Sequence, residues 1–412
     1  MHPFTGLATR EDGAVCVCCR SHPIGFIDKE KLEDIWNNDT MKRIRKQVLN
    51  DERPKECEPC FSLEDQGVES LRQRHIAGII PEARINLYPD SLDKLNDDYS
   101  MPFEIPTMEL KLNNLCNLKC RMCHPMDSTS WNDWGEIKEF YKKENNIMFN
   151  IVEEHNLERK PFLDKFQDNP QWWESLERNL PYFRRVEFAG GEPLMDPQHY
   201  RILDMLKPYG HQIEIKYATN ATTLGIKGGR TIHDYWPHFK SIAVNVSLDG
   251  VNSVYEYIRG NADFNEVDEN IQIIREFPNI SRLVFAMTVQ MGNVLHMRDV
   301  MLYAFKNEAI FHTHRVEYPK LLSAQVLPND LQRLAVQKLE LMKDIARDCY
   351  PSLIKDIRLL EYTLNQIQYN INYLNARDQS HLWRDSIEFN TRLDKTRNQS
   401  LFQVNPEFKL YV

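Results

Sequence analysis

The sequence predicts an α/β fold, because strand-like and helix-like segments alternate along the middle of the chain. Six short segments have the alternation or the β-branched content of strands. These predicted strands are residues 107–112, 184–188, 212–217, 241–248, 282–290 and 310–317. The clearest amphipathic helices between them are residues 199–206, 251–258, 267–277 and 295–305. Such alternation favours parallel strands joined by right-handed crossovers.

The 412 residues divide into three predicted regions, and this length is sufficient for a large core. Residues 1–100 carry five cysteines and end in a polar connector that contains Pro81 and Pro89. Residues 101–320 hold the alternating strands and helices. Residues 321–412 are expected to form helices that pack on the α/β core.

The C-terminal region shows two helical periodicities. Apolar side chains recur at helical spacing over residues 331–345 and again over residues 353–371. Pro351 lies between them and is expected to end one helix and to start the next. Cys349 stands alone in this region, and we expect it to be a small buried apolar side chain.

Composition excludes some classes of protein. The net charge is -9 and the pI is about 5.9, which disfavours nucleic acid as the main partner because phosphate binding needs a basic surface. No run of about 18 apolar residues occurs, so we expect no membrane span. Residues 1–10 lack the basic start and apolar stretch of a signal peptide. A cytoplasmic protein is expected.

Three cysteines form the most informative motif. Residues 116–123 read CNLKCRMC, so Cys116, Cys120 and Cys123 have the spacing C-x3-C-x2-C directly after the first predicted strand. Three thiolates leave one position open for chemistry, whereas a structural zinc site closes with a fourth ligand. An iron–sulfur cluster held by three cysteines leaves one iron free. The spacing alone leaves zinc and iron–sulfur open.

Motifs at later strand ends resolve this choice. Residues 186–194 read VEFAGGEPL, residues 217–220 read YATN, and residues 246–250 read VSLDG. With the three cysteines, these motifs resemble the radical S-adenosylmethionine (AdoMet) enzymes over about residues 105–320. The resemblance implies a partial (β/α)6 TIM-like barrel with its chemistry at the carboxyl ends of the strands. It also implies a [4Fe–4S] cluster that cleaves AdoMet to a 5′-deoxyadenosyl radical, which removes hydrogen from a substrate.

The resemblance assigns roles to individual residues. It makes Cys116, Cys120 and Cys123 the cluster ligands. The residues that it assigns to AdoMet are Met122, Gly190, Gly191, Glu192, Pro193, Asn220, Ser247, Asp249, Arg259, Thr288 and Gln290. In this scheme Glu192 complements the ammonium of the methionine moiety and Arg259 pairs with its carboxylate. Without the cysteines, the polar residues of this set would be interpreted as ordinary turn residues.

A second cysteine group lies near the N-terminus. It consists of Cys16, Cys18, Cys19, Cys57 and Cys60. Residues 14–67 resemble the SPASM/Twitch extension, which binds an auxiliary [4Fe–4S] or [2Fe–2S] cluster and here precedes the barrel. Cys57 and Cys60 are expected ligands, and two of Cys16, Cys18 and Cys19 would complete a set of four. A zinc ribbon is the alternative.

Strand alternation predicts a polar barrel interior. If helices cover the apolar faces, the opposite faces carry the polar side chains. These are Glu109, Lys111, Glu187, Glu214, Lys216 and Asn245. They are candidates for contact with a charged or hydrogen-bonding substrate, and structural ion pairs are an equal alternative.

The resemblance favours modification of a peptide, with a flavodoxin-like or ferredoxin-like electron donor. Radical oxidation or rearrangement of a small metabolite stays open. A zinc-stabilised binding module without enzyme activity is the third possibility. Four tryptophans follow the cysteine motif, and we expect them to pack in the core rather than form a lid; they are Trp131, Trp134, Trp172 and Trp173.

Overall fold

The computed structural model describes residues 2–65, 70, 72–73, 89–144, 147–157, 164–316 and 318–412. Pro81 of the predicted connector and Glu317 at the end of a predicted strand lie outside these residues. The chain forms two compact units. The first is Met1–Asn114, Phe162–Tyr217 and Lys227–Ile242, and the second is Leu115–Pro161, Ala218–Ile226 and Ala243–Val412. The predicted region boundaries near residues 100 and 320 stay a prediction.

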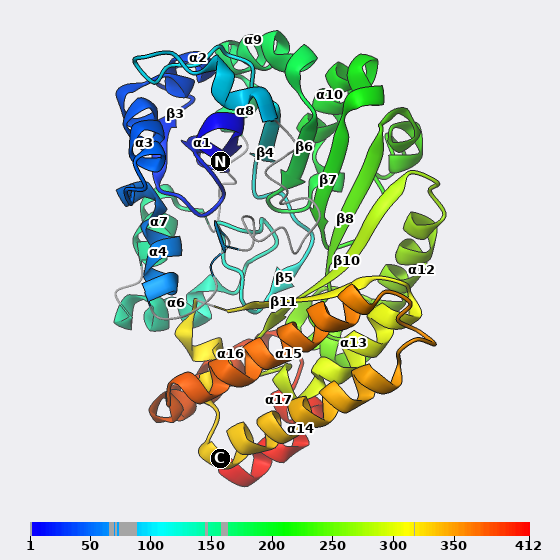
Figure 1. Cartoon of the computed structure of the whole chain (residues 1–412). Coiled ribbons are helices and arrows are strands. Elements are labelled where there is room, and N and C mark those ends of the chain that lie inside the picture. The colour runs from blue at the N-terminus through cyan, green and yellow to red at the C-terminus, as the bar shows by residue number, and fades with distance from the viewer. Residues whose placement is uncertain are drawn as a thin grey trace. The chain divides into compact units, whose positions relative to one another are not determined.

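The first unit contains a mixed sheet whose described strands have the order β7-β6-β4-β1-β2-β3 (Figure 1). The strands are β1 Gly6–Thr9, β2 Ala14–Cys16, β3 Pro23–Phe26, β4 Thr107–Lys111, β6 Arg185–Ala189 and β7 Glu214–Thr219. Strands β1, β4, β6 and β7 are parallel neighbours, and β2 and β3 continue the sheet antiparallel. The N-terminal cysteine region is therefore joined to the strands of the α/β core through β1.

Alternating burial along these strands follows the predicted pattern. Along β4, Met108 and Leu110 are buried while Glu109 and Lys111 are half-buried. The register of β4 and β6 places Met108 beside Val186, so these two buried apolar side chains lie next to each other on one face of the sheet. The period of two thus separates an apolar face from a polar face, as predicted.

Some helices of the first unit begin at side-chain caps. The described helices of this unit are α1 His2–Thr5, α2 Leu32–Trp36, α3 Asp39–Leu49, α4 Glu58–Asp65, α8 Asp164–Gln167, α9 Pro170–Asn179 and α10 Pro197–Leu206. Asn38 caps α3 by accepting the Met41 N–H, and Asp196 caps α10 by accepting the Gln198 N–H. These side chains satisfy backbone donors that the first turn leaves unpaired.

The second unit contains the parallel neighbours β10 Ile280–Val289 and β11 Ile310–Arg315, together with most of β8 Ser241–Ser247, which lies beside β10. A short antiparallel ribbon pairs β5 Lys119–Cys120 with β9 Arg259–Gly260. All six strands predicted from the sequence are present, and where their ends are described they differ from the prediction by at most two residues. The α/β architecture with parallel strands is that of a partial TIM-like barrel.

Three of the four helices predicted between strands belong to the second unit, and the fourth, residues 199–206, is α10 of the first unit. The described helices of the second unit are α6 Trp134–Lys143, α7 Ile147–His155, α11 Asn252–Ile258, α12 Phe264–Arg275, α13 Met297–Lys306, α14 Asn329–Asp348, α15 Ile357–Ala376, α16 Trp383–Arg397 and α17 Leu401–Val404. The prediction that Pro351 starts a helix was wrong. Helix α15 begins six residues later, because Asp356 supplies the N-cap by accepting the Arg358 N–H. Cys349 is buried, as predicted.

Helix α15 covers the edge of the sheet at β11. The Gln366 side chain accepts the Thr313 backbone N–H at 3.0 Å and the Thr313 hydroxyl at 2.9 Å. Asn370 donates to the same hydroxyl at 2.9 Å. An edge strand needs such partners, since an unpaired N–H under a helix would be costly.

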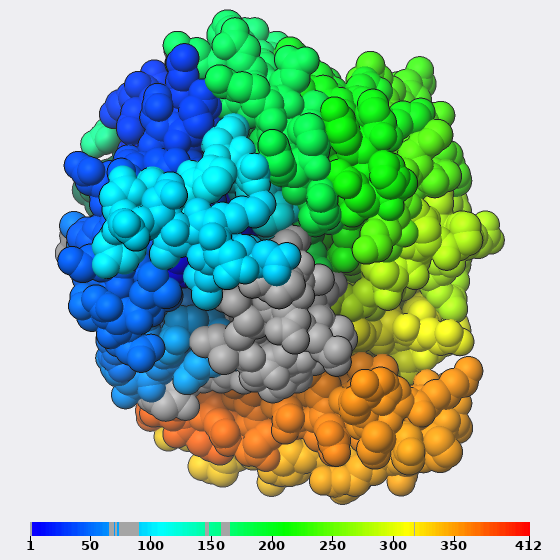
Figure 2. Space-filling view, turned by 45° about the horizontal axis from the view of Figure 1, so that its top comes forward, coloured from blue at the N-terminus to red at the C-terminus, as the bar shows by residue number. Residues whose placement is uncertain are grey.

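The outer faces of α14 and α15 are exposed, and Figure 2 shows this part of the chain in orange. Leu341 and Ile357 are exposed apolar residues on these helices, which is ordinary for a protein surface. Among the described helices, none combines the length and the apolar composition that crossing a bilayer requires.

Candidate active site

The cysteine motif lies in a loop of the second unit that has little regular structure but several fixed points. Cys120 is opposite Arg259 in the β5–β9 ribbon. The Arg121 N–H donates to the Ile258 carbonyl at 2.9 Å. The Trp131 indole N–H donates to the Cys120 carbonyl at 2.8 Å. Distant segments therefore hold the loop in one conformation.

The electrostatic surroundings favour a thiolate at Cys120. The Cys120 sulfur accepts a hydrogen bond from the Cys123 thiol, which lowers the pKa of Cys120, and nearby Arg259 and Arg397 lower it further. The same hydrogen bond raises the pKa of Cys123. Arg259 Nη1 lies 3.5 Å from the Cys120 sulfur. Thiolates are the form that binds metal, so these surroundings favour metal binding at Cys120.

A buried ion pair lies directly behind the loop. Arg259 Nε is 2.7 Å from Asp249 Oδ2, and Asp249 Oδ1 accepts the Thr288 N–H at 2.6 Å. Burial raises the pKa of Asp249, while for Arg259 the attraction of Asp249 and Cys120 outweighs burial and raises its pKa. The pair thus favours the charged form of Arg259, whereas for Asp249 burial outweighs the attraction of Arg259. Arg259, expected to face the AdoMet carboxylate, has Asp249 as its partner in this structure.

The ends of β8 and β10 are tied by one asparagine that the sequence did not reveal. Asn293 donates to the Asp249 carbonyl at 2.9 Å and to the Thr288 carbonyl at 3.1 Å, and accepts the Gln290 N–H at 2.8 Å. Gln290 is fully buried and its Nε2 lies 3.8 Å from the Met122 sulfur. Its Oε1 has no hydrogen-bond partner among the described residues. An acceptor of this kind fits a bound ligand that carries N–H groups.

Asn220 lies beside the first cysteine of the motif. Its Nδ2 is 3.7 Å from the Cys116 sulfur and 3.1 Å from Asn117 Oδ1. Its Oδ1 accepts the Thr222 N–H at 2.9 Å, which is the turn contact that an asparagine makes in any protein. Ser247 ends β8 and is half-buried. The structure brings these candidates into the same unit as the cysteines.

In the first unit, residues 190–193 form the turn that follows β6. Gly190 has a φ of +125°, and a Cβ at this position would lie 3.0 Å from the Asn113 carbonyl oxygen. Only glycine accepts both conditions. Glu192 is 1% exposed and accepts the Leu194 N–H at 3.1 Å, so it caps the 3-10 turn Pro193–Met195. The sequence therefore encodes a rigid turn with a buried carboxylate.

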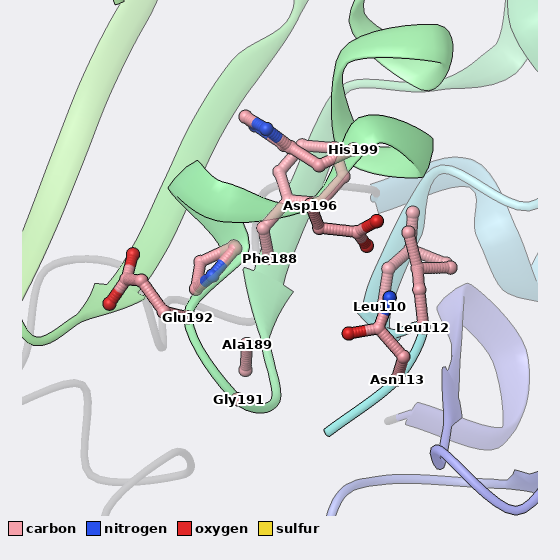
Figure 3. A pocket seen from close by; sticks show the side chains of 10 residues that line it. Leu110, Leu112, Asn113, Phe188, Ala189, Gly191, Glu192, Asp196 and His199 are labelled. Carbon is pink, nitrogen blue, oxygen red and sulfur yellow. The ribbon is translucent and has the colours of Figure 1, made fainter. Parts of the chain in front are cut away.

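A small cavity lies next to this turn (Figure 3). It encloses about 10 Å³, the space of roughly one water molecule, which is far too small for AdoMet. The Asp196 carboxylate points toward Asn113, while the Glu192 carboxylate points away on the other side of the turn (Figure 3). Burial raises the pKa of Asp196 to about 6 and lowers that of His199 to about 3. His199 is therefore neutral, with Nε2 2.9 Å from the Tyr217 hydroxyl.

The polar strand faces carry ion pairs. Lys216 Nζ is 2.8 Å from Glu187, and Arg185 Nε is 3.4 Å from Glu214. Glu214 is the first residue of β7, so it lies at the end opposite to the carboxyl ends where barrel chemistry occurs.

Glu109 and Lys111 occupy the same polar faces, and Asn245 has the corresponding place in β8. Burial, and next the charge of Glu187, raise the pKa of Glu109. Asn245 Oδ1 finds no hydrogen-bond donor within the described part of the chain.

The N-terminal cysteines come from two segments of the first unit. Cys16, Cys18 and Cys19 lie at the end of β2 and after it, whereas Cys57 ends the 3-10 turn Lys55–Cys57 and Cys60 lies in the first turn of α4. The His22 N–H donates to the Glu56 carbonyl at 3.1 Å and joins the two segments.

The thiols separate by their neighbours. Burial raises the pKa of Cys57 to about 11, with Cys18 and Cys60 as the next contributors. For Cys19, burial and then the charge of Glu109 raise the pKa. Cys18 thus has Cys57, Cys60 and Cys19 among its electrostatic neighbours, and Cys19 is in addition close to the Glu109 carboxylate of β4.

No group of three or more His, Cys, Asp or Glu side chains in the described ranges converges as the ligands of a single metal ion do. An iron–sulfur cluster places each thiolate on a different iron, so its cysteines need not converge on one point.

Two family models match the chain. Residues 110–293 match the model of the radical SAM superfamily. The chain contains a radical SAM core. Residues 1–61 match the SPASM model, an iron-sulfur cluster-binding domain. The radical SAM core is thus preceded by the domain type that the N-terminal cysteines predicted.

Solved structures also resemble the chain. Native anSMEcpe with bound AdoMet has 15% sequence identity and a TM-score of 0.39, and the match covers 60% of this chain and 61% of that chain. Streptococcus suis SuiB bound to S-adenosylmethionine has 13% identity and a TM-score of 0.35, with 77% and 63% covered. The chain spans about three fifths of the length of these proteins. No curated protein sequence matches it.

A radical SAM core implies a [4Fe–4S] cluster and AdoMet, and a SPASM domain implies an auxiliary iron–sulfur cluster. The residues present fit the first pair. Cys116, Cys120 and Cys123 supply three sulfur donors, Arg259 favours the thiolate, and the Gln290 acceptor is unpartnered and buried. The two-segment cysteine group supplies enough thiols for the auxiliary cluster.

Proposed function

We propose that this radical SAM chain abstracts a hydrogen atom from a peptide substrate and uses its N-terminal auxiliary cluster in the same turnover. The observation that carries the proposal is the three-cysteine loop, with Cys120 held opposite Arg259 in a matched radical SAM core. When bound, the cluster and AdoMet supply one-electron cleavage of a C–S bond, which yields methionine and a 5′-deoxyadenosyl radical.

The chain's own residues bind and orient in this scheme. Glu192 attracts the methionine ammonium, and Gly190 and Gly191 let the backbone approach it. Gln290 accepts a hydrogen bond from AdoMet, and the Met122 thioether packs beside it. Asp249 keeps Arg259 charged, which leaves the remaining guanidinium N–H groups for the Cys120 sulfur and for an anionic group.

The proposal assigns further AdoMet contacts to Asn220, Ser247 and Thr288, which lie at or next to the carboxyl ends of β7, β8 and β10. Pro193, which begins the 3-10 turn after Glu192, would keep that carboxylate in place.

The substrate class rests on the match to the SPASM model and on the charged strand faces. Half-buried Glu109, Lys111, Glu187 and Lys216 can hydrogen-bond to a peptide's polar groups. Lys216 and Glu187 already pair with each other, so in this proposal a substrate's polar groups would compete for or extend that pair. We place the enzyme in the cytoplasm, where a flavodoxin-like or ferredoxin-like protein supplies the electron.

The first experiment tests the class. The protein is purified without oxygen, its iron, sulfide and zinc are counted, and dithionite and AdoMet are added. We expect iron for two clusters and formation of 5′-deoxyadenosine. Cys120→Ala removes the 5′-deoxyadenosine, while Cys349→Ala, at the isolated buried cysteine, leaves it unchanged. Zinc in place of iron and no cleavage after reconstitution would refute the proposal.

The second experiment tests the substrate. A low-mass extract of the organism that encodes the chain is added before and after digestion with a nonspecific protease. We expect the undigested extract to stimulate 5′-deoxyadenosine formation at least tenfold and the digested extract to lose this effect. Stimulation that survives digestion would assign a small metabolite instead.

A further inference from the structure

We propose that the C-terminal helix α16 helps to form the catalytic cluster site by fixing the three-cysteine loop in place. The contacts are made by Arg121 of the loop and Arg397 of the helix. The inference rests on the proposed function for its meaning. Helix α16 lies outside the residues that match the radical SAM model, which end at residue 293. The contacts between α16 and the cysteine loop are therefore a feature of this chain beyond the matched core.

Arg121 is the link between loop and helix. It stands between the second and third cysteines of the motif, yet its side chain is fully buried. Its guanidinium donates to Asn390 Oδ1 at 3.1 Å, to Gln399 Oε1 at 3.1 Å, and to Asp394. Arg121 Nε donates to the Tyr257 carbonyl at 2.9 Å. Most acceptors of this guanidinium thus come from α16 and the turn that follows it.

The end of α16 is itself fixed, so the acceptors are preorganised. Asp394 Oδ2 accepts the Leu401 N–H at 2.7 Å, and the Gln399 N–H donates to the Asp394 carbonyl at 3.0 Å. Gln399 Nε2 donates to the Glu256 carbonyl at 3.0 Å. Asn398 closes the helix in the left-handed conformation, with φ of +51°.

Arg397 contacts the loop from a second direction. Its Nε donates to Asp133 at 2.7 Å, and its guanidinium lies 4.9 Å over the Trp131 ring, whose indole holds the Cys120 carbonyl. A Cβ on Gly260 would lie 3.4 Å from Arg397 Nη1, so this group rests against the β5–β9 ribbon. Both Nη atoms are buried and find no acceptor among the described residues.

These contacts have a consequence for the cluster. A cluster held by three thiolates carries negative charge, and this charge grows by one on reduction. A buried guanidinium with spare N–H groups stabilises that added charge more than water would. Arg397 is therefore a positioning residue that also favours the reduced state.

The test compares variants of one helix. Asp394→Asn removes the charge partner of buried Arg121, and Arg397→Gln removes the second cation. The matched control is Asp385→Asn, which removes the exposed α16 partner of Lys143 on α6. Thermal melting checks that each variant folds. If Asp394→Asn does not fold, Gln399→Leu is used instead, because it removes one acceptor of Arg121 and keeps the Asp394 carboxylate.

Two measurements are made. In the reduced protein without cluster, the rates of iodoacetamide labelling at Cys120 and Cys123 are measured by peptide mass spectrometry. We expect labelling to be at least fivefold faster in Asp394→Asn and unchanged in Asp385→Asn. In the reconstituted protein, the midpoint potential of the catalytic cluster is measured by EPR. We expect Arg397→Gln to lower the reduced-to-oxidised ratio about tenfold, a shift of 59 mV to more negative potential, and Arg397→Lys to restore part of it.

Labelling rates and potentials equal to those of the unmodified chain in every α16 variant would overturn the inference. The labelling measurement needs no cluster. A protein that binds no iron would therefore refute the proposed function, while the labelling rates would still show whether α16 fixes the cysteine loop.

Discussion

At the residue scale, the site is built from buried charges whose partners are close and specific. Asp249 and Arg259 illustrate this, since neither is more than 9% exposed and their side chains lie 2.7 Å apart. Replacing such a pair by apolar residues is often neutral for stability, so stability alone does not explain its retention. Its position against the Cys120 sulfur explains it better.

The raised pKa of Asp196 leads us to expect that the stability of the folded chain depends on pH. Its pKa is about 6 in the folded chain, mainly through burial, and about 3.9 when unfolded. Between these values the unfolded chain loses its proton first, so stability falls as pH rises from about 4 to 6. The loss amounts to roughly 3 kcal/mol and is complete above pH 6.

We expect Asp196→Asn, which keeps a cap residue, to be more stable than the unmodified chain at pH 7 and to lack this dependence. Urea denaturation at pH 4.5, 5.5, 6.5 and 7.5 measures it. Parallel pH profiles of the two proteins would show that Asp196 is not the responsible group.

Residue-scale prediction from sequence depended on local motifs and missed partners that are distant. Cys120 and Met122 were named as site residues because they belong to one eight-residue motif, and their roles stay predictions. Arg121 lies in that same motif, so adjacency was its available signal. Asn293 follows a predicted strand by three residues and had no motif to mark it.

At the scale of elements, strand periodicity determined most of what was predicted correctly. Alternating burial along β4, β6 and β7 follows the sequence pattern of apolar and polar residues. The turn after β6 does not follow from strand periodicity, because its shape depends on one glycine. Gly190 has positive φ and a close backbone neighbour at the same time.

We therefore expect Gly190→Ala to destabilise the chain by about 3 kcal/mol and to weaken AdoMet binding, since it combines backbone strain with a contact to the Asn113 carbonyl. The matched control is Gly228→Ala. Gly228 also has positive φ, at +72°, but a Cβ there would meet nothing within 4 Å, so we expect about 1 kcal/mol and normal binding. Chemical denaturation and anaerobic equilibrium dialysis with AdoMet give both quantities. Equal losses in the two variants would refute the role of the contact.

At the scale of the whole molecule, cysteine-containing segments in both units are expected to contribute to stability. Because the unfolded chain has no preformed cluster site, the free energy of cluster binding adds to that of folding. The N-terminal cysteines lie in the segments joined to the sheet by β1, so loss of their cluster should loosen this end of the first unit.

We expect removal of both clusters by a chelator to lower the melting temperature by roughly 5 °C or more. The double variant Cys57→Ser, Cys60→Ser should show part of this decrease and contain one cluster's iron less. Cys349→Ser, which changes the isolated cysteine, is the control. Melting curves that coincide with and without iron would contradict the expected linkage.

The sequence by itself determined the α/β class, the six strands, the three-cysteine loop and the presence of an N-terminal cluster domain. Each depends on periodicity or spacing within a few residues, and such local patterns survive in the linear chain. The tertiary structure alone decided which side chains meet. Arg259 reaches Cys120 across 139 residues and Arg121 reaches Asp394 across 273. These pairs form only when the whole chain has packed, because their energy depends on burial and precise distance, and neither property is written in the neighbouring residues.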